Sequence, residues 1–341
     1  MERTPRKKII LTATVELYTV SGEPVGSKVL CENLDIRVSS ATVRNEMSDL
    51  AGMGLLNQPH TSAGRVPSER GWRVYLDSLM TPIPISPEQR HFIDALLLPG
   101  AYDPEKLLDG VSRARAGMTH MAAISTTPSG SGATVSGVQF VQTSRRTAML
   151  ILMTTSGTMH TRVFHCDFDL SPDVLRVFFR VFNEQLTGKP VRRITPAFLQ
   201  TLGAGLGEAA LLMSSALMAL QDAAREAMGS DVRMDGQTNL LFCPEFTPMG
   251  LRRIMQYLDR PQEVYRLLER AGTRVLLGRE SGVPALEDAS LAIAHYAVCG
   301  HDAGAIAVLG PMRMPYRRLL GVLDYVARSV GRMLTELIHL Q

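Results

Sequence analysis

The chain has 341 residues, of which 45% are hydrophobic and 20% charged, and its formal net charge is +3. This composition is ordinary for a globular protein with an apolar core, and no low-complexity segment interrupts it. No apolar run reaches the roughly 18 residues of a membrane span. The four cysteines lie far apart with no CxxC spacing, which disfavours a disulfide or zinc framework. The basic N-terminus continues into an amphipathic segment rather than a signal-peptide core, so we expect a cytoplasmic protein.

The first 80 residues are predicted to form short helices and one hairpin. Apolar periodicity predicts helices over residues 5–20, 27–33, 40–53 and 68–80. Strand character at 55–59, a glycine-bearing polar turn at 60–65 and a return at 66–67 predict the hairpin. Three helices followed by a strand, a turn and a return strand is the order of a winged helix-turn-helix domain, which we place at residues 1–80.

The third helix carries the chemistry of this segment. Ser39 is a favourable N-cap, and Val43, Met47 and Leu50 form its inward face. The opposite face offers side chains that suit base edges in a major groove, and the helix N-terminus and the turn offer phosphate contacts. We predict base readout by Ser40, Ala41, Arg44 and Asn45, and phosphate contacts by Lys28, Ser39, Thr42, Ser62 and Arg65. The net charge of residues 1–80 adds little to the case for DNA binding, since the segment holds ten Lys and Arg against nine Asp and Glu. A capped helix in a generic bundle is the alternative, but a bundle needs no wing after that helix.

The remainder predicts a sheet that a helical block interrupts. A proline-rich linker at 82–87 precedes two expected helices, 87–98 and 104–120. The later elements are a meander of strands (134–142, 147–154, 158–164), a helix (172–186), helical stretches (198–228, 248–270), three more strands (273–278, 290–298, 303–309) and a last helix (316–338). This order favours one α/β domain with a helical insertion. The apolar stretch 202–228 fits either a helix buried in its own domain or a subunit interface.

No other motif carries chemistry. His165-Cys166-Asp167 and His301-Asp302 lack a further ligand at metal spacing, and the glycine-rich runs at 130–132 and 203–207 lack the features of a nucleotide-binding loop. The sequence shows no recognisable set of nucleophile, general base and orienting group. The sequence therefore predicts no metal, no cofactor and no enzymatic activity.

Several long motifs resemble the HrcA family of bacterial heat-inducible transcription repressors. The resemblance covers nearly the whole chain in order. It rests on residues 38–47 (VSSATVRNEM) with Leu50, on 58–68 (QPHTSAGRVPS), on 71–75 (GWRVY), on 236–241 (GQTNLL), on 244–246 (PEF) and on 309–316 (LGPMRMPY).

The resemblance implies an α+β multidomain protein: a winged helix-turn-helix, a GAF-like α/β domain and an inserted, mostly helical dimerising domain. The expected boundaries are 1–80 for the winged helix, 81–103 for a linker and helix, 104–189 and 276–341 for the two parts of the GAF-like domain, and 190–275 for the insertion. It also implies a homodimer that binds double-stranded DNA at an inverted-repeat CIRCE-type operator and represses chaperone operons in the heat-shock response. Temperature and the GroE chaperonin would modulate its activity. A transcription regulator that senses a small molecule through the GAF-like domain remains an alternative.

Overall fold

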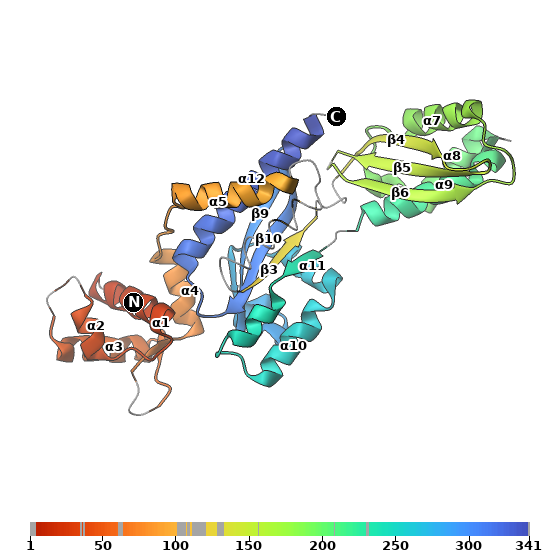
Figure 1. The fold of residues 1–341 in the computed structure, drawn as a ribbon. Coiled ribbons are helices and arrows are strands. Elements are labelled where there is room, and N and C mark those ends of the chain that lie inside the picture. The colour runs from red at the N-terminus through yellow and green to blue at the C-terminus, as the bar shows by residue number, and fades with distance from the viewer. Residues whose placement is uncertain are drawn as a thin grey trace.

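The computed structural model describes residues 5–34, 36, 38–60, 64–100, 107, 110, 121–127, 133–155, 157–207, 209–229 and 232–339. Figure 1 shows three groups of elements: an N-terminal helical unit, a central five-stranded sheet with helices on both faces, and a second, three-stranded sheet with its own helices. Among the described residues, no helix is long and apolar enough to cross a membrane.

The N-terminal unit confirms the predicted helices and hairpin. Its elements are α1 (Pro5–Ser21), α2 (Ser27–Glu32), α3 (Ser40–Gly52), β1 (Leu56–Asn57), β2 (Val66–Pro67) and α4 (Glu69–Ser78). The two strands pair antiparallel, with Leu56 opposite Pro67. Serine hydroxyls cap α3 and α4, because Ser39 and Ser68 each accept a backbone N–H from the first turn. Local sequence signals therefore set the starts of α3 and α4.

The central sheet is antiparallel throughout. Its strand order is β7 (Val232–Asp235), β3 (Ala122–Thr126), β10 (His301–Pro311), β9 (Ala289–Val298) and β8 (Val275–Leu277). Alternate residues of a strand point to opposite faces. In β9, Ala292, Ala294 and Tyr296 pack with α12 (Tyr316–His339), whereas Leu291 and Ile293 pack with α10 (Pro248–Leu258) and α11 (Pro261–Arg270). The sheet is therefore buried on both faces.

The second sheet forms a separate core. It contains β4 (Val135–Gln142), β5 (Thr147–Thr154) and β6 (Met159–His165), covered by α7 (Pro172–Leu186), α8 (Pro196–Leu206) and α9 (Ala209–Ala227). Every second residue of β5 is buried, the pattern of a sheet with one covered face. We call residues 133–229 the insertion unit, because they lie in sequence between β3 and β7, which pair side by side in the central sheet.

The strand pairing differs from the expected organisation. The sequence predicts that the meander belongs to the interrupted sheet, but among the described residues β4–β6 pair only with one another. The interrupted sheet begins with the unpredicted strand β3. Residues 232–275 were expected in a helical insertion, yet β7 and β8 belong to the central sheet and α10 and α11 pack on it. The expected boundaries after residues 189 and 275 therefore do not coincide with the pairing. β3 and β7 have five and four residues and show no alternation of exposed and buried positions, so periodicity gave no signal for them.

Two expected helical stretches are also broken. Gly207, at φ +57°, ends α8 before α9 begins, and Pro261 starts α11 after α10 has ended at Leu258. The helix expected over 104–120 and the glycine loop at 130–132 lie almost wholly outside the described residues.

One apolar core joins the N-terminal unit to the central sheet. It runs from Leu11 and Leu50 through Trp72 to Tyr316 and Leu323 of α12. The Trp72 ring lies 5.6 Å from the Tyr316 ring, centroid to centroid, in an edge contact. Burial raises the pKa of Tyr316, whose hydroxyl donates to Ser290 at 2.8 Å. In the part of the chain that the structure describes, the core of the insertion unit shares no residue with this one.

Candidate nucleic-acid interface

The N-terminus of α3 is held by paired hydroxyls. Ser39 has extended backbone angles, and its Oγ accepts the backbone N–H of Thr42 at 3.1 Å. The two side-chain hydroxyls lie 2.9 Å apart and share a hydrogen bond. Ser39 and Thr42, both predicted phosphate contacts, thus lie together at the N-terminus of the helix, the end that favours anions.

The exposed face of α3 holds the predicted reading residues. Val43, Met47 and Leu50 are at most 3% exposed, whereas Ala41, Arg44 and Asn45 are exposed. Ser48 extends this face by one turn and is also exposed. The face is therefore polar, carries one methyl group, and lies opposite the buried side of the helix.

Ser40 differs from the other members of the predicted set. It is half-buried, and its hydroxyl lies 3.3 Å from that of Ser27 in α2. This hydrogen bond ties the first turn of α3 to the first turn of α2. Lys28, next to Ser27, is exposed at the start of α2.

The base of the hairpin is fixed to the segment before α2. Arg65 is half-buried and exchanges two backbone hydrogen bonds of 2.9 Å with Val25. A Cβ on Gly64 would collide with the Val25 backbone, so only glycine allows this close approach. Ser62, another predicted phosphate contact, lies outside the described residues.

Charges on α1 are already paired with α3. Lys7 contacts Asp49 at 2.9 Å and Glu46 at 3.3 Å, and Arg6 lies 3.6 Å from Glu46. The hydrogen bond that Lys7 donates to Asp49 is the main reason that the pKa of Lys7 is raised. Within the described part of the chain, Arg44 has no such carboxylate partner, so its guanidinium is available at the surface.

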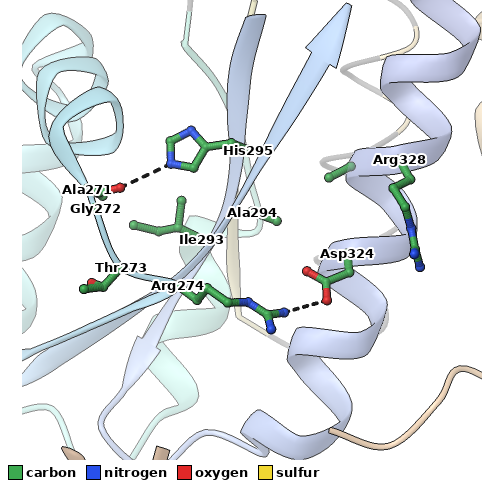
Figure 2. A pocket seen from close by; sticks show the side chains of 10 residues that line it. Ala271, Gly272, Thr273, Arg274, Ile293, Ala294, His295, Asp324 and Arg328 are labelled. Atoms are coloured by element: carbon green, nitrogen blue, oxygen red, sulfur yellow. Dashed lines mark hydrogen bonds and ion pairs between the residues drawn. The ribbon is translucent and has the colours of Figure 1, made fainter. Parts of the chain in front are cut away.

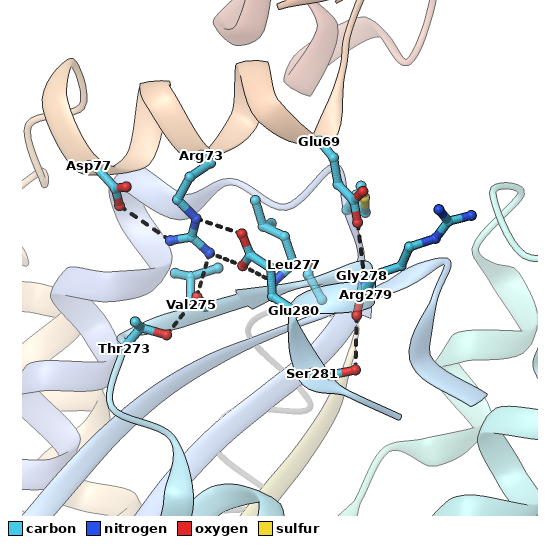
Figure 3. A network of polar contacts seen from close by, with 12 residues as sticks. Glu69, Arg73, Asp77, Thr273, Val275, Leu277, Gly278, Arg279, Glu280 and Ser281 are labelled. Atoms are coloured by element: carbon cyan, nitrogen blue, oxygen red, sulfur yellow. Dashed lines mark hydrogen bonds and ion pairs between the residues drawn. The ribbon is translucent and has the colours of Figure 1, made fainter. Parts of the chain in front are cut away.

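Sequence reasoning missed the polar network that fixes α4 to the central sheet. Figure 3 shows Arg73 bound to the carboxylate of Glu280, to Asp77 at 3.2 Å and to the Val275 carbonyl at 2.9 Å. One turn earlier, Glu69 accepts the backbone N–H of Arg279 at 3.1 Å. Arg73 and Glu280 are 207 positions apart, and no local pattern links residues at that separation.

A hollow of about 300 Å³ beside α12 shows no catalytic arrangement. In Figure 2, Arg274 pairs with Asp324 at 2.6 Å, and His295 points toward the carbonyl of Ala271 at 3.3 Å. These contacts join an arginine to a carboxylate and an imidazole to a backbone oxygen, so none of them activates a nucleophile. No group of three or more metal-ligating side chains occurs among the described residues.

Comparison with known proteins decides the family. A family model described as "HrcA protein C terminal domain" matches residues 105–320. A heat-inducible transcription repressor HrcA of Moorella thermoacetica is 32% identical over 343 residues, covering 99% of both chains. The chain belongs to the HrcA family. The HrcA proteins of Desulforudis audaxviator and Pseudarthrobacter chlorophenolicus are 33% and 34% identical, each covering 97% of this chain and 98% of its own length.

The family membership predicted from the motifs is thus confirmed. HrcA is a family of heat-inducible transcription repressors, not of enzymes. One solved structure, titled "Crystal structure of a hypothetical protein at 2.2 A resolution", aligns with 98% of this chain and 100% of its own at a TM-score of 0.66 and 22% identity. At that identity it supports the fold alone.

Proposed function

We propose that this HrcA protein acts as a homodimeric repressor that binds an inverted-repeat operator of chaperone genes through a winged helix-turn-helix. The observation that carries the proposal is the exposed polar face of α3, with Arg44 free of any carboxylate among the described residues. In this domain type the helix in the position of α3 enters the major groove and the hairpin forms the wing. The name shared by the relatives supports the repressor role.

Each predicted residue has a definite task in this proposal. Arg44 donates to a guanine edge, Asn45 pairs with adenine and Ala41 packs on a thymine methyl. Ser40, tied to Ser27 in the free protein, would need to exchange that hydrogen bond to reach a base. Phosphate contacts come from the N-terminus of α3, from Lys28 and from the wing residues Ser62 and Arg65.

The test is a binding titration that compares operator with random duplex. Arg44→Ala should lose about 1–3 kcal/mol of discrimination, because a bidentate base contact is removed. Lys28→Ala should instead weaken binding to both duplexes equally. It should also reduce the slope of log affinity against log salt concentration by about one. An Arg44→Ala protein that prefers the operator as strongly as the wild type refutes the base-reading role.

We further propose that the dimer forms through the insertion unit, whose described range 133–229 replaces the expected 190–275, and that the central sheet is the GAF-like domain. Leu211 and Met218 of α9 are 80% and 69% exposed and lie two turns apart on one side of the helix. Large exposed apolar side chains on one face suit a contact with a second copy of the same surface.

The oligomeric state tests the dimer surface. Leu211→Asp should shift the dimer to monomer in sedimentation, whereas Phe242→Asp, which replaces an 84% exposed apolar residue outside the insertion unit, should leave it intact. A Leu211→Asp protein that stays dimeric at the same concentration as the wild type contradicts this surface.

Regulation by temperature and the GroE chaperonin, in the cytoplasm, completes the proposal. The description "heat-inducible" of the relatives supports the thermal part. In a purified system, heating should reduce operator binding and added chaperonin should restore it. Operator binding that is unchanged by heating and by added chaperonin contradicts the proposed regulation but not the proposed DNA binding.

A further inference from the structure

A groove on the central sheet lies next to the network that fixes α4. It has a volume of about 510 Å³ and runs between α11 and the segment after β8, at the sheet edge. This volume lies within the range of roughly 300–1,000 Å³ typical of small-molecule sites. Leu267, Leu276 and Val283 give it an apolar wall.

The charges of the groove favour an anion. Its two carboxylates are already paired, Glu280 with Arg73 and Glu263 with Arg260 at 3.4 Å. Arg266 and Arg270 also line it, and within the described part of the chain neither makes an ion pair. They lie four residues apart on α11, so both guanidinium groups extend along the same side of the helix. Guanidinium groups match carboxylates and phosphates through two parallel hydrogen bonds.

The segment 275–281 separates this groove from α4. On one side, Val275 and Glu280 hold Arg73, and the backbone N–H of Arg279 donates to Glu69 (Figure 3). On the other side, Leu276 and Ser281, which follows Glu280 in sequence, line the groove. Glu280 itself belongs to both. A molecule in the groove therefore contacts segment 275–281, and this segment in turn binds Arg73 and Glu69 of α4.

We propose that this groove binds an organic anion, a carboxylate or a phosphate ester with an apolar body, and that its occupancy is coupled through segment 275–281 to the placement of α4. The head group pairs with Arg266 and Arg270 while the body covers Leu267, Leu276 and Val283. The coupling is reciprocal, so DNA binding and anion binding each change the affinity for the other. This inference adds a ligand to the repressor proposed above, but anion binding itself requires no DNA.

The first test uses the fluorescent amphipathic anion 8-anilinonaphthalene-1-sulfonate with the full-length protein. Wild type should bind it saturably, and the double variant Arg266→Gln/Arg270→Gln should bind at least about tenfold more weakly, the change expected for about 1.4 kcal/mol. Arg252→Gln is a control for the loss of a surface arginine elsewhere. It removes an exposed arginine of α10 that does not line the groove, and it should bind like the wild type. Melting curves confirm that the surface variants remain folded.

Octanoate and octyl phosphate then compete for the probe. Displacement by either supports the site and identifies the preferred head group. Fluorescence that does not saturate, equal affinity in the double variant and the Arg252→Gln control, or failure of both competitors overturns it.

The second test measures the coupling. Trp72 is the single tryptophan of the chain and neighbours Arg73, so its emission reports on α4. Whichever of the two competitors displaces the probe should shift that emission in the wild type and not in the double variant. Unchanged emission at saturating ligand overturns the coupling. Since this readout uses no DNA, its failure is distinguishable from failure of operator binding.

Discussion

Phe182→Ala tests whether the insertion unit folds on its own core. Phe182 is fully buried in α7, and its ring lies 5.2 Å from that of Phe140 in β4. Replacing a core phenylalanine with alanine costs about 3–5 kcal/mol, from lost burial and the remaining cavity. The lost aromatic pair forms part of that figure. Because the two cores have no described residue in common, the loss should stay within the insertion unit.

The assay follows unfolding in guanidinium chloride with two probes at one protein concentration. Trp72 fluorescence reports on the junction of α4 with α12, and far-ultraviolet circular dichroism reports on the whole chain. Phe182→Ala should move one dichroism transition to lower denaturant and leave the Trp72 midpoint unchanged. Leu50→Ala, in the core shared by α3 and Trp72, should move the Trp72 midpoint. A Phe182→Ala protein whose Trp72 midpoint falls as far as that of Leu50→Ala refutes the separation of the cores.

Two further predictions concern the cap of α3 and the docking of α4 on the central sheet. Ser39→Ala removes the acceptor for the Thr42 N–H and should cost about 0.5–2 kcal/mol in thermal or denaturant unfolding, together with weaker DNA binding. Ser48→Ala on the exposed face of α3 is its control and should change stability by less than about 0.5 kcal/mol; equal effects of the two contradict the capping role. Gly278→Ala places a side chain at φ +44° and against the Glu69 carboxylate, so it should cost about 1–3 kcal/mol and red-shift the Trp72 emission. A Gly278→Ala protein with wild-type melting and emission contradicts the tight docking of α4.

Local signals explain why the N-terminal unit was predictable. The cap at Ser39, the spacing of Val43, Met47 and Leu50, and the glycine of the hairpin each act within a few residues. Periodicity also gave the strands β4–β6 as elements. The exposed face of α3 followed from the same spacing, since the residues opposite a buried stripe face solvent.

Pairing between distant segments explains what was not predictable. β3 and β7 flank about one hundred residues of sequence and become neighbours only through the hydrogen bonds of the central sheet. A meander has the same sequence pattern whether it extends one sheet or forms another. The local sequence therefore does not show which sheet β4–β6 belong to. The ion pair between Arg73 and Glu280 likewise depends on where α4 docks. The sequence near either residue does not predict that docking position.

A quantitative footprint tests whether α3 reads an inverted-repeat operator through Arg44. The wild-type protein is titrated onto the DNA upstream of the chaperonin operon of its own organism, beside Arg44→Ala and the surface control Arg252→Ala. The wild type and the control should each protect two related half-sites, about 34 Å or a multiple of that apart, and Arg44→Ala should lose this preference. No protection by the wild type, or the same protection by Arg44→Ala, would contradict it.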